Sequence, residues 1–438
     1  MNIKTAEENM HSKKIKLLFF VMVSIVLMAP NAFAAGSGGI RVELADSEAA
    51  GKGFAFAGQA DNPSAVYYNP AGLTQLKGDN HFSGGFSVLS PSASYKDFAG
   101  NETQMTRQNF PIPHIYLVSD FGLDDFVFGL GGVSSWGTGT AWADDSFSRY
   151  AATESDVKNI DTLVTAAYKF NEQLSFGISA DFDYSVANKS KKLLQAGGAD
   201  GDYNLKAKDS GWGYRLATHY KLSDHHKFGL MYRSPIQLKY RGKAFLHELN
   251  GSGSNFAAIF GGSSFETNIA EEFELPQSVV LGYSYQPDNK WTFNFDVEWM
   301  DWSSLEQERL EFTEVLTAAQ AAVLNTGNPA NRDWDAVWSG AVGIEYAWSD
   351  DLRLRGGYYQ HTAPGPEENF ESTLPDANKY GVTTGFGYDL TENSTFDMAY
   401  SYLVYENITI DNAIASGTIN GTYEQVMHMG LVTYSYKF

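Results

Sequence analysis

The chain of 438 residues contains no cysteine. A disulfide scaffold, a thiol nucleophile and a thiolate-ligated metal are therefore excluded. No stretch beyond the first 35 residues approaches the about 18 consecutive apolar residues of a membrane-spanning helix. Basic residues are also in deficit, because 31 Lys and Arg stand against 52 Asp and Glu, for a net charge of −21. A chain this acidic repels nucleic acid, so that class of partner is excluded.

Familiar catalytic motifs are missing as well. The sequence has no G-x-S-x-G, no H-E-x-x-H and no phosphate-binding loop. The pair His225-His226 falls in a short polar turn, where solvated histidines are the ordinary interpretation. We therefore expect no enzyme, no cofactor and no metal site.

The N-terminus has the pattern of an export signal. A lysine-rich stretch precedes an apolar run over residues 17–29, and Ala32-Phe33-Ala34 follows as an A-x-A cleavage site. The apolar run is too short to span a bilayer as a stable anchor. We interpret residues 1–34 as a secretory signal peptide. Its removal makes the chain more acidic, because it carries four lysines and two glutamates.

Strict alternation of apolar and polar residues is the best-marked feature of the remaining chain. In residues 291–299 every odd position is apolar and every even position is polar, and residues 175–184 and 396–402 alternate similarly. Successive side chains of a strand point to opposite faces, so such strands are amphipathic. Trp291 and Trp299 cap a stripe of roughly 26 Å at ~3.3 Å per residue. After a tilt of ~40° this stripe matches the ~25 Å apolar band of outer-membrane barrels, with its aromatic girdles.

Turn lengths favour the same architecture. Tight polar turns, such as residues 170–173 and 391–393, alternate with loops of roughly 15–30 residues, and the last strand ends on Phe438. We predict an all-β fold, a transmembrane antiparallel β-barrel of about 14 strands over residues 79–438. The predicted strand centres are residues 84, 115, 129, 163, 180, 216, 233, 280, 296, 342, 356, 384, 400 and 432.

Residues 35–78 do not fit the strand pattern. They are rich in glycine and alanine and have no sustained period of two. Small residues let a segment pack closely against a wall, and a barrel of this width would otherwise hold a water channel. We expect a small N-terminal plug (hatch) inside the lumen, with a tail outside the barrel as the alternative.

Two blocks resemble the FadL family of outer-membrane transporters for long-chain fatty acids and other hydrophobic compounds. Residues 60–73 read ADNPSAVYYNPAGL, similar to the family's plug motif, and residues 356–389 resemble its paired strands around a Pro-rich loop. LPQSVVLGYSY and the SSWG stretch ending at Gly137 match too, so the resemblance covers essentially the whole exported chain. It departs at His361 and Lys379, where Asp and Arg are usual, and in the short loop near residues 188–210.

The resemblance implies roles for two sites. Asn69-Pro70-Ala71 would help to hold the plug in the barrel, whereas the alternative is a simple Asn-Pro turn. Gly137 would lie at an inward kink of the third strand that opens the wall sideways, whereas the alternative is an ordinary loop glycine. Glycine weakens a strand ladder and marks bulges, which is compatible with the kink.

Residues 242–272 form an expected long loop with many apolar side chains. Exposed loops rarely carry so many without a partner. They either form an external groove for an acyl chain, as the resemblance implies, or pack over the barrel mouth. The candidate ligand-binding residues are Phe245, Leu246, Phe256, Ile259, Phe260 and Phe265. Lys191, Lys192 and Arg332 are candidate partners of a substrate carboxylate. The alternatives are contacts of lipopolysaccharide phosphates or solvated surface residues.

The expected function is passive uptake of long-chain fatty acids or similar hydrophobic molecules across a Gram-negative outer membrane, with sideways exit through the wall. A surface adhesin or phage receptor, a water-filled porin and an aromatic-hydrocarbon importer of the same family are the alternatives. Expected partners are the hydrophobic ligand, outer-membrane lipid with lipopolysaccharide, and the barrel-insertion machinery. We expect a monomer.

Overall fold

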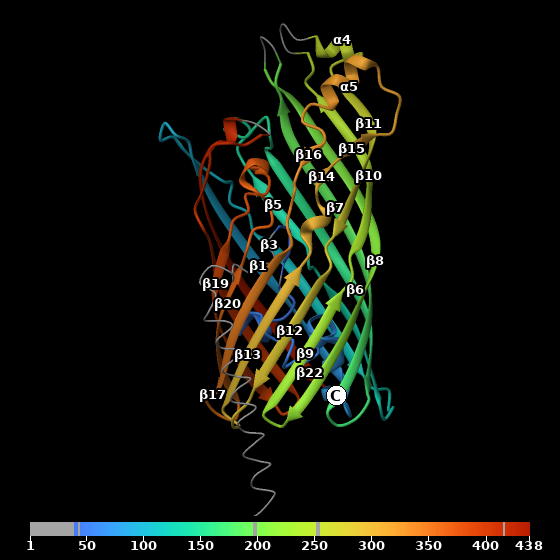
Figure 1. Ribbon diagram of the computed structural model, residues 1–438, viewed down its shortest axis with the longest axis vertical. Coiled ribbons are helices and arrows are strands. Elements are labelled where there is room, and N and C mark those ends of the chain that lie inside the picture. The colour runs from blue at the N-terminus through green and yellow to red at the C-terminus, as the bar shows by residue number, and fades with distance from the viewer. Residues whose placement is uncertain (1–38, 43, 196–198, 251–254, 415–416) are drawn as a thin grey trace, which may run out of the picture.

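A computed structural model describes residues 39–42, 44–195, 199–250, 255–414 and 417–438. The expected signal peptide, residues 1–34, lies outside these described residues. Figure 1 shows a tall, closed barrel of tilted strands with two short helices above its upper rim. Within the described ranges, none of the helices is both long enough and apolar enough to cross a membrane.

The strands follow one another along the chain with tight turns at one end. In the first half they are β1 (His81–Lys96), β2 (Glu102–Gln104), β3 (Phe110–Ser119), β4 (Phe126–Val133), β5 (Gly137–Ala141), β6 (Glu154–Lys169), β7 (Leu174–Leu193), β8 (Gly201–Ser223), β9 (His226–Arg233) and β10 (Ile236–His247). In the second half they are β11 (Phe265–Leu275), β12 (Ser278–Tyr285), β13 (Trp291–Met300), β14 (Gln307–Glu308), β15 (Leu310–Phe312), β16 (Ala330–Asn331), β17 (Val337–Ala347), β18 (Leu352–His361), β19 (Lys379–Thr391), β20 (Ser394–Tyr405), β21 (Ile408–Ile410) and β22 (Gly421–Lys437).

The helices are short. They are α2 (Ser47–Gly51), α3 (Ala65–Tyr68), α4 (Phe256–Phe260) and α5 (Ala318–Leu324), with 3₁₀ turns η1 (Pro70–Leu76), η2 (Trp302–Ser304), η3 (Glu367–Asn369) and η4 (Gly417–Ile419). Among the described residues, α2, α3 and η1 precede the first strand. The others lie in connections of the barrel.

The strand pairings close a barrel of fourteen antiparallel spans. Four spans are built from two successive strands each, namely β4 with β5, β9 with β10, β12 with β11, and β13 with β15. The first span closes on the last, from His81 opposite Lys437 to Lys96 opposite Thr422. Closure leaves no sheet edge in the hydrocarbon, where unpaired backbone groups are costly. The predicted fold class and strand number are confirmed, and each predicted strand centre lies within a strand.

The faces of the strands are inverted relative to a soluble protein. In β13 the polar side chains point inward, and Asn294 is 1% exposed. Apolar side chains face outward instead, so that Ile178 is 54% and Val164 59% exposed. A soluble sandwich would bury the apolar face. The outward apolar face is that of a barrel in lipid.

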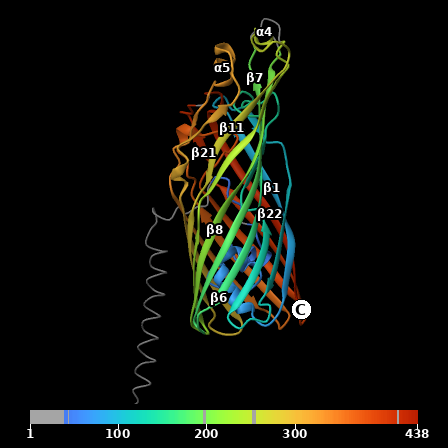
Figure 2. The ribbon, with the colours of Figure 1, turned by 90° about the vertical axis from the view of Figure 1, so that its right-hand side faces the viewer.

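The strands on one side rise well above the rest (Figures 1 and 2). β7 and β8 are 20 and 23 residues long, and β10 and β11 pair beside them. These strands occupy much of residues 242–272, so the expectation of one long loop there is wrong. The connection between β10 and β11 is residues 248–264, because the apolar and polar alternation continues beyond the membrane as paired strand.

Residues 39–42 and 44–76, hereafter the lumenal segment, lie inside the barrel. The blue ribbon of this segment runs between the walls in the lower half of the barrel in both views. Its apolar side chains are buried against inward-facing side chains of the wall, as those of Phe56, Val66 and Leu73 are. The segment begins α2 with Asp46, whose carboxylate accepts the Ala49 amide at 3.0 Å.

Candidate functional site

The third span of the barrel is interrupted midway. β4 ends at Val133, opposite Asp161 of β6, and β5 begins at Gly137, opposite Lys158. Three residues of the third span, 134–136, therefore face only two on the continuous β6. One extra residue against an unbroken partner is a β-bulge, which bends the strand that carries it. The interruption predicted at Gly137 is thus present and ends at that residue.

Asn159 of β6 satisfies the backbone at the interruption. Its buried side-chain oxygen accepts the Trp136 amide at 2.8 Å, and its main-chain oxygen accepts the Ser134 hydroxyl at 2.6 Å. The Asn159 side-chain nitrogen donates to Asp183 on β7 at 2.6 Å. A buried amide without a partner would be costly, so Asn159 makes the interruption a stable part of the wall.

The opposite edge of the interruption pairs with the lumenal segment. The Val42 amide donates to the Ser135 carbonyl, and the Gly137 amide donates to the Ile40 carbonyl, both at 2.8 Å. β3 pairs with β4 only as far as Ile115 opposite Gly132. Residues 40–42 therefore take the place beside the third span that a longer β3 ladder would fill.

β5 lies deeper in the lumen than β3. Gly139 is opposite Asp156 of β6. The even-numbered residues of this part of β6 point outward, as the exposed Ile160 does, so the matching side of Gly139 also faces outward. Phe110 lies four residues before the buried His114 on β3, so its side chain points inward on the same face of the strand. A Cβ added at Gly139 would nevertheless overlap the Phe110 ring. The outer face of β5 thus lies against an inward-pointing side chain of β3, which is an inward kink.

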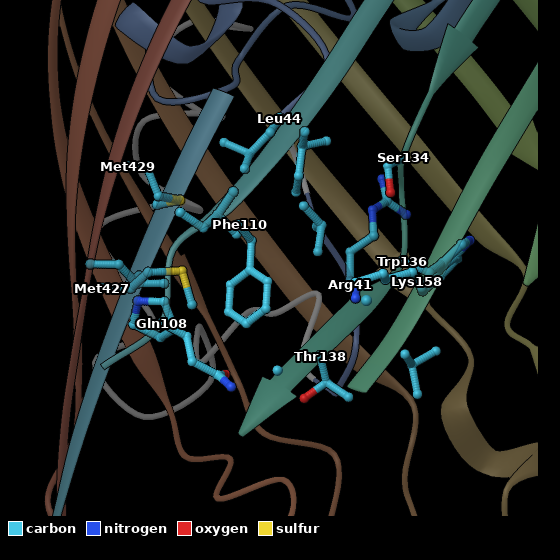
Figure 3. Close-up of a pocket in the computed structure, with 18 of the residues that line it drawn as sticks. Arg41, Leu44, Gln108, Phe110, Ser134, Trp136, Thr138, Lys158, Met427 and Met429 are labelled. Carbon is cyan, nitrogen blue, oxygen red and sulfur yellow. The ribbon is translucent and has the colours of Figure 1, made fainter. Parts of the chain in front are cut away.

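A cavity of about 930 Å³ occupies this region. Its lining includes Leu44, Phe110, Trp136 and Met429 from the lumen (Figure 3). It also includes Ile115, an exposed lipid-facing residue of β3. The cavity therefore reaches from the lumen to the outer face of the wall, between β3 and β5.

The lining is mostly apolar, and its cations have acidic partners. Each lysine or arginine of the lining forms an ion pair with a carboxylate of the chain itself. The pairs are Arg41–Glu298 at 3.7 Å, Lys158–Asp156 at 2.6 Å and Lys379–Asp376 at 2.9 Å. The cavity is therefore suited to apolar molecules more than to anions.

Asn69 joins the lumenal segment to the wall. It is fully buried, and its side-chain nitrogen donates to the carbonyls of Ala57 at 2.9 Å and Thr218 of β8 at 3.1 Å. Its side-chain oxygen accepts the Ala71 amide at 3.1 Å and starts η1, with Pro70 at the first position. The motif Asn69-Pro70-Ala71 thus forms a turn and a link to the wall at once.

Glycines in the wall make room for the segment. A Cβ added at Gly229 would meet the Ala57 carbonyl and the Asn69 side chain, and one added at Gly177 would meet Pro70. Larger residues at these two wall positions would displace the segment.

Buried charges hold the other end of the segment. Glu48 pairs with Lys52 at 2.8 Å and with Arg355 of β18 at 3.8 Å. Burial raises the pKa of Glu48, but the charges of Lys52 and Arg355 outweigh burial and bring this pKa well below its usual value. Burial, with the nearby charge of Glu48, raises the pKa of Asp46 to about 7.

The predicted apolar ligand site lies elsewhere, at the tip of the barrel. Phe245 and Leu246 belong to β10, Phe256–Phe260 is α4, and Phe265 begins β11. Five of the six predicted residues pack in one cluster with α5 and neighbouring strands, namely Leu246, Phe256, Ile259, Phe260 and Phe265. Leu246 and Phe260 are buried, and the rings of Phe260 and Phe265 are 4.8 Å apart. None of the six is among the described residues that line the large cavity.

The three predicted cations already have partners. Lys191 lies over the Tyr203 ring at 5.4 Å, and Lys192 pairs with Asp202 at 2.8 Å. Arg332 pairs with Glu308 and Glu371, both at 2.8 Å, beside a smaller cavity of about 100 Å³. Glu308 and Glu371 are distant from Arg332 in the sequence, so these ion pairs could not be predicted from the sequence.

Several residues of the site were missed by the sequence analysis. Phe110, Gly139 and Asn159 carry no recognised motif. Pro111 and Pro113 offered a signal, because proline in a barrel strand is confined to edges and bulges. Together with the glycine pair 137 and 139, these prolines mark the two borders of the opening.

A protein-family model described as "Outer membrane protein transport protein (OMPP1/FadL/TodX)" matches residues 25–438. The chain belongs to this family. The family resemblance inferred from the sequence is therefore confirmed. The protein is an outer-membrane β-barrel and an outer-membrane transport protein.

Individual relatives are distant but cover nearly the full length. The long-chain fatty acid transport protein of Escherichia coli (strain K12) is 21% identical, over 89% of this chain and 92% of the relative. A putative outer membrane protein of Neisseria meningitidis serogroup B is 26% identical, over 90% and 92%. The crystal structure of a Pseudomonas aeruginosa FadL homologue has a TM-score of 0.78 at 18% identity, over 91% of this chain and 99% of that one. The Pseudomonas putida toluene transporter TodX has a TM-score of 0.69 at 20% identity, over 92% and 99%.

Proposed function

We propose that the protein takes up long-chain fatty acids or similar hydrophobic molecules passively. The molecule enters from outside, passes above the lumenal segment and leaves sideways between β3 and β5. The observation that carries this proposal is the apolar cavity of about 930 Å³ whose lining joins lumenal and lipid-facing side chains. The relative from Escherichia coli, a long-chain fatty acid transport protein, supports this substrate.

Passive movement is energetically sufficient. Each CH₂ group of an acyl chain that leaves water gains about 0.8 kcal/mol. A dry path past the polar lipopolysaccharide layer is then enough, and the bilayer itself is the sink. In this scheme the lumenal segment is a plug that denies water a continuous path through the barrel, and the exported chain consists of plug residues 35–78 and barrel residues 79–438.

A second candidate substrate is an uncharged aromatic hydrocarbon. The ion pairs of Arg41, Lys158 and Lys379 support this candidate, because these three cations are already paired with carboxylates of the chain and would otherwise bind the carboxylate of a fatty acid. The similarity to a toluene transporter supports it too. Competition tests whether the two substrates share one path, because excess toluene should suppress oleate uptake only if both use the same cavity.

Gly137→Val tests the sideways path. A Cβ at Gly137 would lie 3.0 Å from the Val157 carbonyl oxygen, so this contact must relax by a few tenths of an ångström, and a β-branched residue favours a regular strand. We expect normal insertion and severalfold lower uptake of labelled oleate in cells that lack their own transporter. Gly430→Val is the matched control, because a Cβ there meets no atom within 4 Å. Uptake equal to the wild type at matched surface levels would contradict the sideways path.

Two further partners are proposed from the positions of exposed or outer residues. We propose that the exposed Phe438, one residue beyond β22, contacts the barrel-insertion machinery. Lys191 and Lys192 lie at the outer end of β7, and we propose that they also meet lipopolysaccharide phosphates.

A further inference from the structure

The Phe110 ring bridges the opening in the wall. Phe110 is the first residue of β3, and its ring reaches the α-carbon of Gly139 on β5, on the side where any other residue would carry its Cβ. Figure 3 shows the ring between Met427 and Met429 on one side and Trp136 and Thr138 on the other. A molecule that passes between β3 and β5 must pass this ring.

Two elements cover the glycines of β5, and they are held differently. Val42, near Gly137, belongs to a backbone stretch fixed by two hydrogen bonds to the third span. The main chain of Phe110 is paired opposite Leu89 of β1, but its ring is held by apolar packing alone. Apolar packing is non-directional, so the ring can turn while both strands stay in place.

There is space for the ring to turn. The cavity of about 930 Å³ adjoins the ring on the lumenal side. An aromatic side chain moves between staggered χ1 rotamers. When the Phe110 ring leaves its present rotamer, the space over Gly139 becomes free. No backbone hydrogen bond has to break for this motion.

We propose that the Phe110 side chain is the size-selecting element of the wall opening, with Gly139 as the surface on which it closes. This inference rests on the proposed sideways exit. It adds that the Phe110 ring selects molecules by their width. Slender chains pass with a small displacement of the ring, and bulky ring systems need it fully turned.

The test compares two fatty acids that share a head group, oleate as the slender probe and pyrene-decanoate as the bulky one. The full chain is expressed at matched surface levels in cells that lack their own transporter. For Phe110→Ala we expect pyrene-decanoate uptake to rise about threefold to tenfold, the factor of an avoided rotamer change, with oleate uptake changed less. Phe293→Ala is the matched control, since Phe293 lies on the outward face of β13.

A second pair of variants tests the contact itself. In Gly139→Ala the new methyl group overlaps the ring and takes up the space over β5 that a turned ring would open, so we expect severalfold lower uptake of both probes. Adding Phe110→Ala should restore uptake to the level of Phe110→Ala alone. Such non-additivity identifies a direct contact, and a general loss of barrel stability would not be rescued.

The outcomes separate this inference from the proposed function. If Gly137→Val abolishes oleate uptake but Phe110→Ala leaves the ratio of the two probes unchanged, the sideways exit stands and the role of Phe110 is refuted. If Phe110→Ala raises both probes equally, Phe110 is an obstacle without selectivity, which also refutes the proposal. If cells with the wild-type chain take up neither probe above empty cells, the proposed function itself fails.

Discussion

The side-chain nitrogen of Asn69 donates a hydrogen bond to the main-chain carbonyl of Thr218, 3.1 Å away, and so ties the lumenal segment to strand β8. Asn69 also starts η1 and holds the Ala57 carbonyl. One buried amide therefore organises both the segment and its attachment to the wall.

Asn69→Ala should loosen the lumenal segment. The change removes three hydrogen bonds, each of about 0.5–1.5 kcal/mol, including the one that joins the segment to β8. We expect normal insertion and a clear rise in single-channel conductance for small ions in planar bilayers. Asn101→Ala, in an exposed turn, serves as the control. Conductance equal to the wild type would reduce the motif to a turn.

Gly229→Ala should displace the same segment from the wall side. The added methyl group meets the Ala57 carbonyl and the Asn69 side chain, neither of which can yield without moving the segment. We predict increased conductance, together with faster cleavage of the segment by added protease in detergent. The same change at Gly430, where space is free, should leave both measurements unaltered.

Asp46→Asn should stabilise the protein at alkaline pH. Burial, with the nearby charges of Glu48 and Asp397, raises the pKa of Asp46 to about 7. The folded protein therefore holds a proton that the unfolded chain releases above about pH 4. The wild type thus loses stability between about pH 4 and pH 7, and above pH 7 the loss is complete. Asparagine still caps α2 and carries no charge.

The measurement is the unfolding temperature in detergent at pH 5 and pH 8. We expect a larger gain for Asp46→Asn at pH 8 than at pH 5. Asp288→Asn, in an exposed turn, should show no such difference. An equal shift at both pH values would mean that Asp46 is ionised throughout.

The apolar cluster at the barrel tip either forms an external ligand groove or packs to stabilise the barrel, and one double variant distinguishes the two roles. Phe260 is buried against Phe265, and Phe256 packs beside it. This burial favours packing, so Phe256→Ser with Phe260→Ser should lower the unfolding temperature, because the loss of the buried Phe260 ring alone costs about 3–5 kcal/mol.

Oleate affinity of the purified double variant should then change little. Phe98→Ser, at an exposed position in another loop, is the control for surface effects. A drop in affinity of tenfold or more with unchanged stability would instead support the external groove of the sequence analysis.

The number and placement of strands could be predicted from the sequence because each span alternates locally. Residues 291–299 carry their polar face inward as the pattern requires. The extent of residues 242–272 was mispredicted, because a strand that leaves the membrane still alternates and its apolar residues suggested a loop cluster.

The opening in the wall could be predicted only in part. Gly137 marked the interruption, but its stabilisation depends on pairing with Ile40 and Val42, about 95 residues earlier. Likewise the partners of Arg332 are set by loops that meet only in the folded barrel. Contacts across such separations have no local signature in a single sequence.

The pairing of residues 40–42 with the third span also constrains how the molecule is assembled. The carbonyl of Ser135 and the amide of Gly137 have their partners on a stretch that precedes the first wall strand. The seam between β1 and β22 joins the two ends of the sheet. A barrel sealed around an empty interior would leave those two groups without their backbone partners at the edge of the opening. We therefore expect the filling of the interior and the sealing of the seam to be coupled, and a barrel closed without its contents should be a target of quality-control proteases.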